Sequence, residues 1–129
     1  MSEPPLSRDD AATIFERRRD AWLREDLDAY VALFAEDVFL ETPMGEPVRG
    51  RDAYIRLVRR SYEALAPVSF VFHEIAVHGP KVLAEWTITM RLRADDRQIS
   101  YRGMSTCELR DGLIQTWREY YDPSHLRPS

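Results

Sequence analysis

Glu119 is the residue of this sequence whose type and surroundings best suit proton-transfer chemistry. In the segment Trp-Arg-Glu-Tyr-Tyr, the alternation of a β-strand places Trp117, Glu119 and Tyr121 on one face. Because Trp117 and Tyr121 favour an interior position, Glu119 is expected to point inward with them. Aromatic surroundings raise the pKa of a carboxyl group by desolvation, and a raised pKa suits a general acid or base near neutral pH. Glu119 is therefore predicted to be catalytic.

Glu41 and Arg18 are the two charged residues expected to face Glu119. In the strand-like run Val38–Thr42, Glu41 shares a face with Phe39, so it is predicted to be a second inward, catalytic carboxylate. Arg18 lies on the apolar stripe of the first helix, where it is expected to bind an oxyanion or a carboxylate of a ligand. Two other interpretations stay open: Arg18 forms a buried ion pair with one glutamate, or its head group reaches solvent at the rim.

Apolar and aromatic side chains on the predicted inward side supply a lining for a ligand. Alternation puts Trp86 and Ile88 on the apolar face of a long strand, and Tyr54 lies on the apolar face of the third helix. The candidate ligand-binding residues from these patterns are Arg18, Phe39, Tyr54, Trp86, Ile88, Tyr101, Trp117 and Tyr121. The alternative is that the rings fill the interior completely, because aromatic side chains at sheet spacing form cores more often than pockets.

Composition excludes several classes of function. With a net charge of −4 the chain is not expected to bind nucleic acid, which requires a basic surface. Cys107 is the one cysteine and the histidines are not at metal-ligand spacing, so neither a metal nor an organic cofactor is expected. The sequence shows no signal pattern and no membrane-spanning apolar run, which predicts a cytoplasmic protein. A length of 129 residues predicts one domain over residues 1–129.

The elements that must position these side chains are helices in the first half of the chain and strands in the second. Ser7 is a helix cap, and Asp111-Gly112 is a hairpin turn signal. Helices are predicted from Ser7 to Arg24, over Asp26–Phe34 and over Arg51–Ala64, and strands over Val38–Thr42, Val68–Val77, Lys81–Leu92, Ile99–Arg110 and Leu113–Tyr121. This order predicts an α+β fold in which three N-terminal helices pack on one face of a strongly curved, mainly antiparallel sheet.

Several phrases of the sequence resemble the SnoaL-like family of the nuclear-transport-factor-2-like superfamily. They lie at Leu27–Tyr30, Leu33–Val38, Glu41–Gly45, Val48–Ala53, Leu109–Ile114 and Trp117–Pro123. The resemblance covers nearly the whole chain and implies a cone-shaped, cystatin-like roll with a hydrophobic pocket, and a homodimer formed through the open face of the sheet. It does not imply one activity, because this fold hosts isomerases, epoxide hydrolases, polyketide cyclases and binding proteins.

Two enzyme types of the superfamily test the resemblance residue by residue. Ketosteroid isomerases use an aspartate base, a tyrosine and a protonated aspartic acid, and the corresponding positions here hold Thr42, Arg18 and Ser105. That set is altered, and Ser105 joins the candidate ligand-binding residues. Limonene epoxide hydrolases use an Asp-Arg-Asp trio with a tyrosine and an asparagine that hold water. The corresponding positions here are Glu119 for the last-strand aspartate, Trp86 and Ile88 for the rest of the trio, and Phe39 and Glu41 for the water-holding pair.

These observations support two hypotheses about function. In the first, the chain is an enzyme that moves protons on an apolar substrate with a carbonyl, epoxide or hydroxyl, with Glu119 as acid or base, Glu41 as its partner, and Arg18 or Tyr101 as the polar anchor. In the second, it is a non-catalytic module that holds a hydrophobic ligand or assists a partner enzyme, which the altered catalytic sets favour. A protein-transport adaptor is a third interpretation, but no exposed signature for Phe-repeat binding is present.

Overall fold

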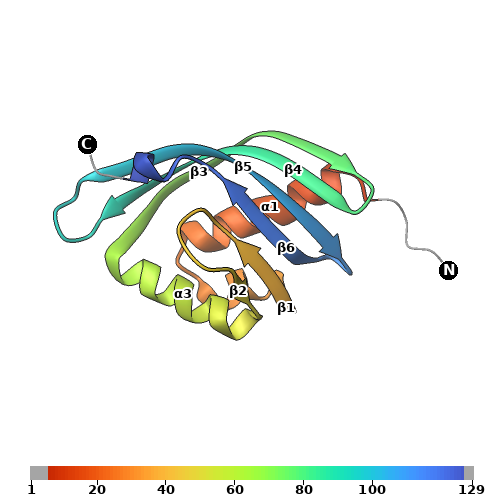
Figure 1. Cartoon of the computed structure of the whole chain (residues 1–129), viewed down its shortest axis with the longest axis horizontal. Helices are drawn as coiled ribbons and strands as arrows, with labels where there is room; N and C mark the ends of the chain where they lie inside the picture. The colour runs from red at the N-terminus through yellow and green to blue at the C-terminus, as the bar shows by residue number, and fades with distance from the viewer. Residues whose placement is uncertain (1–5, 127–129) are drawn as a thin grey trace.

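The computed structural model describes residues 6–126, and its elements follow the predicted order of helices first and long strands later. Figure 1 shows β3, β4 and β5 arching over α1, with α3 on the same side of the arch. Within the described residues the elements are α1 (Arg8–Leu23), α2 (Leu27–Val31), β1 (Phe34–Glu41), β2 (Val48–Arg49), α3 (Arg51–Ala64), β3 (Leu65–His78), β4 (Lys81–Leu92), β5 (Gln98–Arg110), β6 (Leu113–Tyr120) and a 3-10 turn, η1 (Pro123–Leu126).

Local sequence accounts for the start of α1 and for the face that it buries. The Ser7 side chain accepts a hydrogen bond from the Asp10 backbone amide, and the Asp10 side chain accepts one from the Ser7 amide, which forms a capping box. From this start, the buried side chains recur at helical spacing: Ala11, Ile14, Phe15, Arg18 and Ala21. Arg18 shares this buried face with four apolar residues, so it is turned toward the core.

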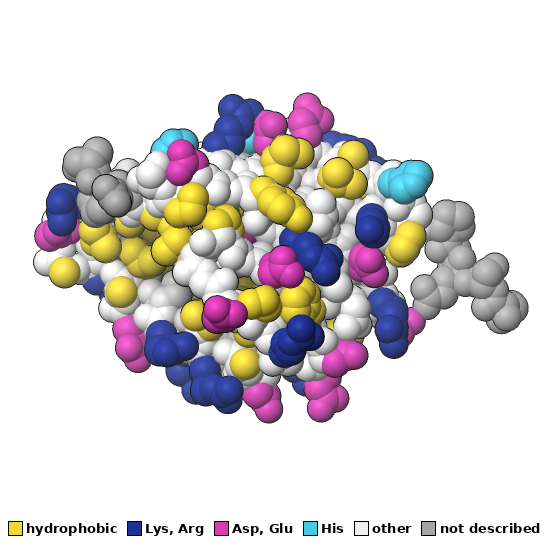
Figure 2. Space-filling model, in the orientation of Figure 1, with side chains coloured by type: hydrophobic (Ala, Val, Ile, Leu, Met, Phe, Trp, Pro, Cys, Tyr) yellow, Lys and Arg dark blue, Asp and Glu magenta, His cyan; other side chains and the backbone are white. Residues whose placement is uncertain are grey.

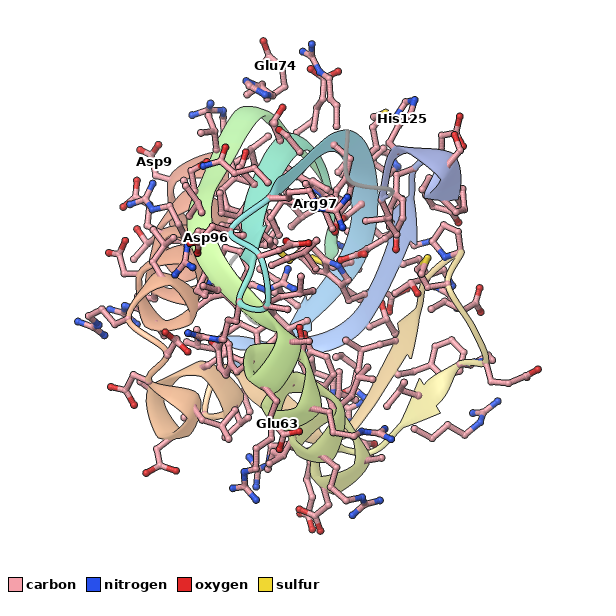
Figure 3. All side chains as sticks on the ribbon, turned by 90° about the vertical axis from the view of Figure 1, so that its left-hand side faces the viewer. Asp9, Glu63, Glu74, Asp96, Arg97 and His125 are labelled. Atoms are coloured by element: carbon pink, nitrogen blue, oxygen red, sulfur yellow. The ribbon has the colours of Figure 1, made fainter. Side chains whose placement is uncertain are left out.

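The six strands form one sheet in the order β2-β1-β6-β5-β4-β3. All neighbouring pairs are antiparallel except β1 and β6, which run parallel. The helices pack on the concave side of this curled sheet, and the buried core lies between the two layers. Charged side chains such as Asp9, Glu63 and Glu74 point away from it (Figure 3). The predicted α+β architecture of helices on a curved, mostly antiparallel sheet is confirmed.

The main differences from the predicted element boundaries have identifiable reasons. The second helix ends at Val31 rather than at Phe34, and β1 begins at Phe34 rather than at Val38, because Phe34 pairs with Ile114 of β6 and is completely buried. β3 begins at Leu65 and runs through Pro67, which the sequence places before the strand. β3 is an edge strand, so the missing N–H of Pro67 removes no sheet hydrogen bond that a second neighbour would need.

Candidate functional site

The concave face of β5 and β6 carries the predicted catalytic glutamate. Ser105 pairs with Glu119 and Cys107 with Trp117 across these antiparallel strands, so all four side chains lie on one face. Trp117, Cys107 and Ser105 are buried, whereas Glu119 is partly exposed. The structure therefore turns Glu119 to the inner face, as the alternation of the strand predicts, and leaves it partly exposed beside buried aromatic side chains.

Arg18 reaches the interior beneath this face and is held there by two tyrosines. Its Nε and Nη2 donate to the Tyr30 hydroxyl over 3.3 and 3.1 Å, and the Tyr30 and Tyr54 hydroxyls lie 2.5 Å apart. Because the two Arg18 donors occupy the lone pairs of the Tyr30 oxygen, the hydroxyl hydrogen of Tyr30 is left to donate to Tyr54. Helices α1, α2 and α3 thus each contribute one residue to a directed hydrogen-bond chain that fixes the guanidinium.

Aromatic rings enclose the Arg18 guanidinium. It lies 3.8 Å from the centroid of the Trp117 ring and within 6 Å of the Phe34 and Phe70 rings. Arg18 is only 3% exposed, which excludes the interpretation that its head group reaches solvent. No carboxylate within residues 6–126 lies at ion-pair distance from it, so the alternative of a buried Arg18–glutamate pair is not met either.

One nitrogen of Arg18 is left without a partner. Nη1 is buried and has no hydrogen-bond acceptor among the described residues. Burial by itself lowers the pKa of an arginine, but the oxygens of Tyr30, Tyr54 and Glu119 favour the charged form more strongly, so the pKa of Arg18 lies above its ordinary value. The site therefore contains a buried positive charge, one nitrogen of which has no hydrogen-bond acceptor among residues 6–126.

Trp117 connects this cation to Glu119. The indole carries the Arg18 guanidinium on its face, while its Nε1–H donates a hydrogen bond of 2.8 Å to Oε1 of Glu119. Burial raises the pKa of Glu119 above its ordinary value, whereas the charge of Arg18 and the hydrogen bond from Trp117 act in the opposite direction and reduce the rise. A carboxyl group in this balance can be held in either protonation state, which proton transfer requires.

Two tyrosines at the same edge add hydroxyl groups near Glu119. Tyr101 and Tyr121 are partly buried, and their ring centroids are 4.8 Å apart. Burial first, and then the charge of Glu119, raises the pKa of Tyr121 to about 12 and that of Tyr101 still further. Both phenols therefore stay protonated near neutral pH and can serve as hydrogen-bond donors.

Trp86 and Ser105 form a second buried polar contact on this face. The Trp86 Nε1–H donates to the Ser105 hydroxyl over 2.7 Å, and the Trp86 ring packs against Tyr101 and Tyr121. Gly103, opposite Trp86 on β5, leaves the space for this ring, since an added Cβ would lie 2.7 Å from it. Ile88 is buried next along β4 and pairs with Tyr101. The predicted lining residues of β4 and β5 are thus brought together.

Glu41 and Phe39 are not brought to this site, which corrects the predicted orientation of their strand. In β1 the buried side chains are Val38 and Leu40, so Phe39 and Glu41 point to the opposite, convex face. There, Glu41 pairs with Arg118, at 3.9 Å between Oε1 and Nε, and the Arg118 guanidinium lies 5.4 Å from the Phe39 ring centroid. The prediction rested on Phe39 as the apolar marker of the inner face. The parallel pairing of Leu40 with buried Trp117 shows that the other set faces inward.

Tyr30 is a site residue that the sequence analysis did not single out as functional. It lies at an apolar helix position, where tyrosine and phenylalanine are equally expected, so periodicity alone assigns only its burial. The available signal was the coincidence of two polar residues, Arg18 and Tyr30, at positions that both predict burial. Buried polar groups need partners, and this requirement favours contact between the two.

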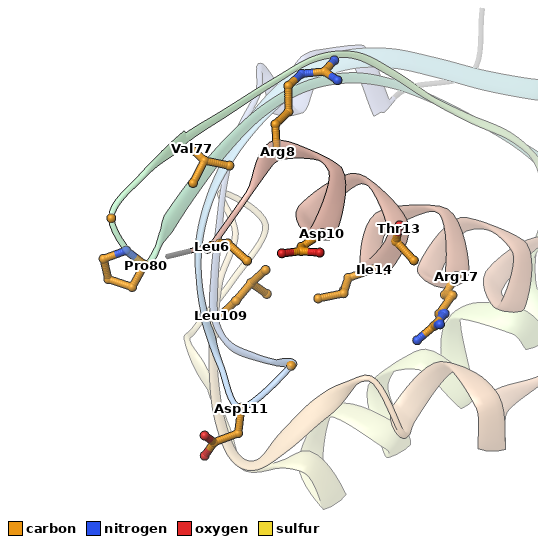
Figure 4. A pocket seen from close by; sticks show the side chains of 12 residues that line it. Leu6, Arg8, Asp10, Thr13, Ile14, Arg17, Val77, Pro80, Leu109 and Asp111 are labelled. Carbon is orange, nitrogen blue, oxygen red and sulfur yellow. The ribbon is translucent and has the colours of Figure 1, made fainter. Parts of the chain in front are cut away.

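Residues 6–126 contain no group of three or more His, Cys, Asp or Glu side chains positioned to hold a metal ion, and no helix there is long and apolar enough to cross a membrane. A hollow of about 1100 Å³ lies between the start of α1 and the β3–β4 and β5–β6 turns (Figure 4). Its described lining, which includes Arg8, Asp10 and Arg17, contains none of the predicted site residues.

Solved structures similar to this chain share its fold over most of their length. An LEH-like epoxide hydrolase from Mycobacterium tuberculosis is 24% identical with a TM-score of 0.80, over 92% of this chain and 87% of that chain. A candidate polyketide cyclase from Xanthomonas campestris is 23% identical with a TM-score of 0.75, over 91% and 93%. A protein with a ketosteroid isomerase-like fold from Catenulispora acidiphila, solved in complex with trimethylamine, is 18% identical with a TM-score of 0.79, over 88% of each chain.

The family of the chain follows from its sequence. No curated protein matches it significantly. The model of the SnoaL-like domain, however, matches residues 15–117, which contain Arg18, Tyr30, Tyr54 and Trp117 and end two residues before Glu119. This match confirms the resemblance predicted from the sequence phrases, and the similar structures confirm the fold. The chain therefore belongs to the SnoaL-like family.

Proposed function

We propose that the protein is an acid–base enzyme that acts on a small, apolar, oxygenated molecule and uses Glu119 as its proton-transfer group. The observation that carries this proposal is the placement of Glu119: a carboxyl group with a raised pKa, held by Trp117 at the accessible edge of a buried aromatic surface. Carboxyl groups whose pKa is shifted in this way are concentrated at catalytic sites.

The chemistry assigned to Glu119 has two directions. When protonated, it donates a proton to an epoxide or carbonyl oxygen; when ionised, it takes a proton from a carbon next to a carbonyl or from an attacking hydroxyl. Positioned proton transfer of this kind contributes about 10²–10⁴-fold to a rate. Tyr101 and Tyr121, protonated near neutral pH, donate hydrogen bonds to the oxygen on which charge develops. The names of two similar structures, an epoxide hydrolase and a candidate polyketide cyclase, are consistent with these reaction types.

A second candidate function is a non-catalytic module that binds a ligand or pairs with another subunit. It is favoured by exposed apolar side chains on the convex face of the sheet; Figure 2 shows hydrophobic side chains at the surface among charged and polar ones. Val71, Leu83, Met104 and Tyr120 are all exposed there. Burial of these side chains against a second copy of the chain would remove an apolar surface from water, so we include a homodimer through this face in the proposal.

The substitution Glu119→Gln tests the enzyme hypothesis. It keeps the size of the side chain and its hydrogen-bond acceptor for Trp117 but removes the titrating proton. In a panel of apolar ketones and epoxides, the turnover rate of the variant is expected to be about 10²–10⁴-fold lower than that of the wild type. Glu108→Gln, which removes a carboxylate of β5 that pairs with Lys81 on the convex face, is the matched control and is expected to keep wild-type turnover. Unchanged turnover in Glu119→Gln removes Glu119 from the mechanism.

A further inference from the structure

Arg18 is enclosed by the protein, so its effect on the site passes through its neighbours. Its side chain is 3% exposed, and its Nη1 is buried without a hydrogen-bond partner among residues 6–126. Nε and Nη2 both donate to the hydroxyl of Tyr30, which holds the guanidinium in one place. What this fixed cation does for the site depends on the groups that it touches.

The aromatic neighbour closest to the guanidinium is the indole of Trp117. The centroid of this ring lies 3.8 Å from Cζ of Arg18, whereas the centroids of the other rings around it lie 5.5–5.7 Å away. A cation against the face of an indole draws electron density toward itself, which makes the indole N–H a stronger hydrogen-bond donor. Arg18 therefore both fixes the plane of Trp117 and strengthens the N–H that this ring presents.

The two oxygens of the Glu119 carboxyl group have different surroundings. Oε1 accepts a hydrogen bond of 2.8 Å from Nε1–H of Trp117. Oε2 has no hydrogen-bond partner among residues 6–126, yet the one enclosed side-chain nitrogen or oxygen without a partner there is Nη1 of Arg18, so Oε2 is not enclosed. Because an N–H directed at Oε1 disfavours a second hydrogen on that oxygen, the proton of the acid form belongs on Oε2.

We propose that Arg18 is a positioning residue, which holds the Trp117 indole so that its N–H fixes Oε1 of Glu119 and leaves Oε2 to exchange a proton with the substrate. This inference rests on the proposed function and adds the atom at which the proton moves. In the acid direction the O–H bond at Oε2 breaks, the proton goes to the substrate oxygen, and the electron pair stays on the carboxyl group. In the base direction Oε2 takes the proton, and Trp117 donates to Oε1 throughout.

Among residues 6–126, Arg18 is the one charged group that the structure couples to Glu119. The other ionisable groups that face this carboxyl group are Tyr54 on α3, Tyr101 on β5 and Tyr121 after β6. Burial raises the pKa of all three phenols, so they are neutral near pH 7. Burial also raises the pKa of Glu119, whereas the charge of Arg18 and the hydrogen bond from the indole lower it. Removal of either contact is therefore expected to raise that pKa further.

NMR titration of the full chain, labelled with ¹³C at the glutamate carboxyl carbons, tests the positioning. Trp117→Phe keeps an aromatic ring and removes the N–H, and Arg18→Met keeps an unbranched side chain and removes the charge. Both are expected to raise the titration midpoint of Glu119, whose signal is assigned by its loss in Glu119→Gln. Arg17→Met removes an exposed charge of the same helix; it is the matched control and is expected to leave the midpoint unchanged.

The indole N–H signal gives a second measurement. The chain has three tryptophans, so Trp117→Phe assigns the signal of Trp117 by its disappearance. Arg18→Met is expected to move this signal upfield, because the N–H is less polarised and its hydrogen bond is weaker. If Arg18→Met does not fold, as judged by circular dichroism, Tyr30→Phe takes its place. This variant removes the acceptor of two Arg18 donors, and the same direction is expected.

Turnover gives a measurement that a merely structural role would not move. In Trp117→Phe, kcat is expected to fall at least about tenfold, the worth of a hydrogen bond to a charged group. KM is expected to stay nearly unchanged, because Trp117 is completely buried and does not touch the substrate.

An unmoved Glu119 midpoint in Trp117→Phe would overturn the proposal, as would an unmoved indole signal in Arg18→Met or in the variant that replaces it. These results are distinguishable from failure of the proposed function. Unchanged turnover in Glu119→Gln with a raised midpoint in Trp117→Phe rejects the proposed function but supports the positioning of the carboxyl group. Loss of turnover in Glu119→Gln with an unmoved midpoint in Trp117→Phe has the reverse meaning.

Discussion

At the scale of single residues, the central feature of the site is that Trp117 contacts both the Arg18 guanidinium and the Glu119 carboxyl group. Trp117 carries the charge of Arg18 on its ring face and donates its N–H to Glu119. An aromatic face holds the cation and an N–H donor holds the carboxylate, and the indole of Trp117 supplies both. Phenylalanine at position 117 would keep the contact with Arg18 and leave Glu119 without its hydrogen-bond donor.

The raised pKa of Glu119 makes the stability of the fold depend on pH. Because burial favours the protonated carboxyl group in the native state, its contribution to the free energy of unfolding is fully present below the ordinary value of 4.5 and is lost as the pH rises through the raised pKa. Urea unfolding at a series of pH values is therefore expected to show a fall in stability above 4.5 that Glu119→Gln removes and Glu108→Gln keeps. Identical pH profiles for the wild type and Glu119→Gln would contradict the assignment.

The sequence predicts the inward direction of Glu119 but not that of Glu41, and the difference has a physical cause. In β6 two flanking aromatic residues, Trp117 and Tyr121, both indicate the same inner face. In β1 the apolar residues Val38, Phe39 and Leu40 are consecutive, so alternation does not identify the buried set. Only the pairing of Leu40 with Trp117, a contact between distant parts of the chain, decides it.

At the scale of elements, the packing of β4 on β5 depends on a glycine beneath a tryptophan. A Cβ at Gly103 would lie 2.7 Å from Cη2 of Trp86 and 3.0 Å from the backbone oxygen of Tyr120, so one of these groups must move. The backbone of Gly103 is ordinary extended strand, and the effect of a substitution is therefore one of space. The sequence shows the glycine, but it does not show which ring crosses it.

Gly103→Ala is expected to destabilise the protein by about 1–3 kcal/mol, the usual cost of overpacking a buried contact. Gly45→Ala is the matched control, because a Cβ there meets nothing within 4 Å, and it is expected to stay within about 0.5 kcal/mol of the wild type. Chemical unfolding followed by tryptophan fluorescence measures both. Equal free energies of unfolding for the two variants would contradict this prediction and would mean that the Trp86 ring shifts without cost.

The long antiparallel strands are the part of the fold that the sequence predicts best. Asp111 and Gly112 both adopt positive φ, at 55° and 76°, which is the backbone that the Asp-Gly hairpin signal indicates. The parallel pairing of β1 with β6 and the short strand β2 are not encoded in any local pattern. They depend on contacts between segments far apart in the chain, which periodicity does not report.

At the scale of the whole molecule, the convex face of the sheet is the surface proposed to join two copies. The helices leave it uncovered, and it carries exposed apolar side chains on several strands. When a partner covers a sheet face with apolar side chains, it removes their surface from water, which favours association. On the helix side, Asp9 of α1 and Glu63 of α3 point away from the core (Figure 3).

Analytical ultracentrifugation over a range of concentrations tests this assembly. The wild type is expected to sediment as a dimer, and the double variant Leu83→Glu, Met104→Glu as a monomer, because two buried charges without partners cannot be accommodated in an apolar interface. Leu57→Glu, on the exposed side of α3, is the matched control and is expected to stay dimeric. A monomeric wild type, or a double variant that remains dimeric, would reject the convex face as the contact.

The parallel pair β1–β6 also has a consequence for biosynthesis. Phe34 pairs with Ile114, so the first strand has no place in the sheet until the last strand has left the ribosome. The sheet between β1 and β5 therefore stays open until β6 has joined both strands. Because β6 carries both Trp117, which is completely buried, and Glu119, which accepts its hydrogen bond, the candidate site is assembled only in the step that completes the sheet.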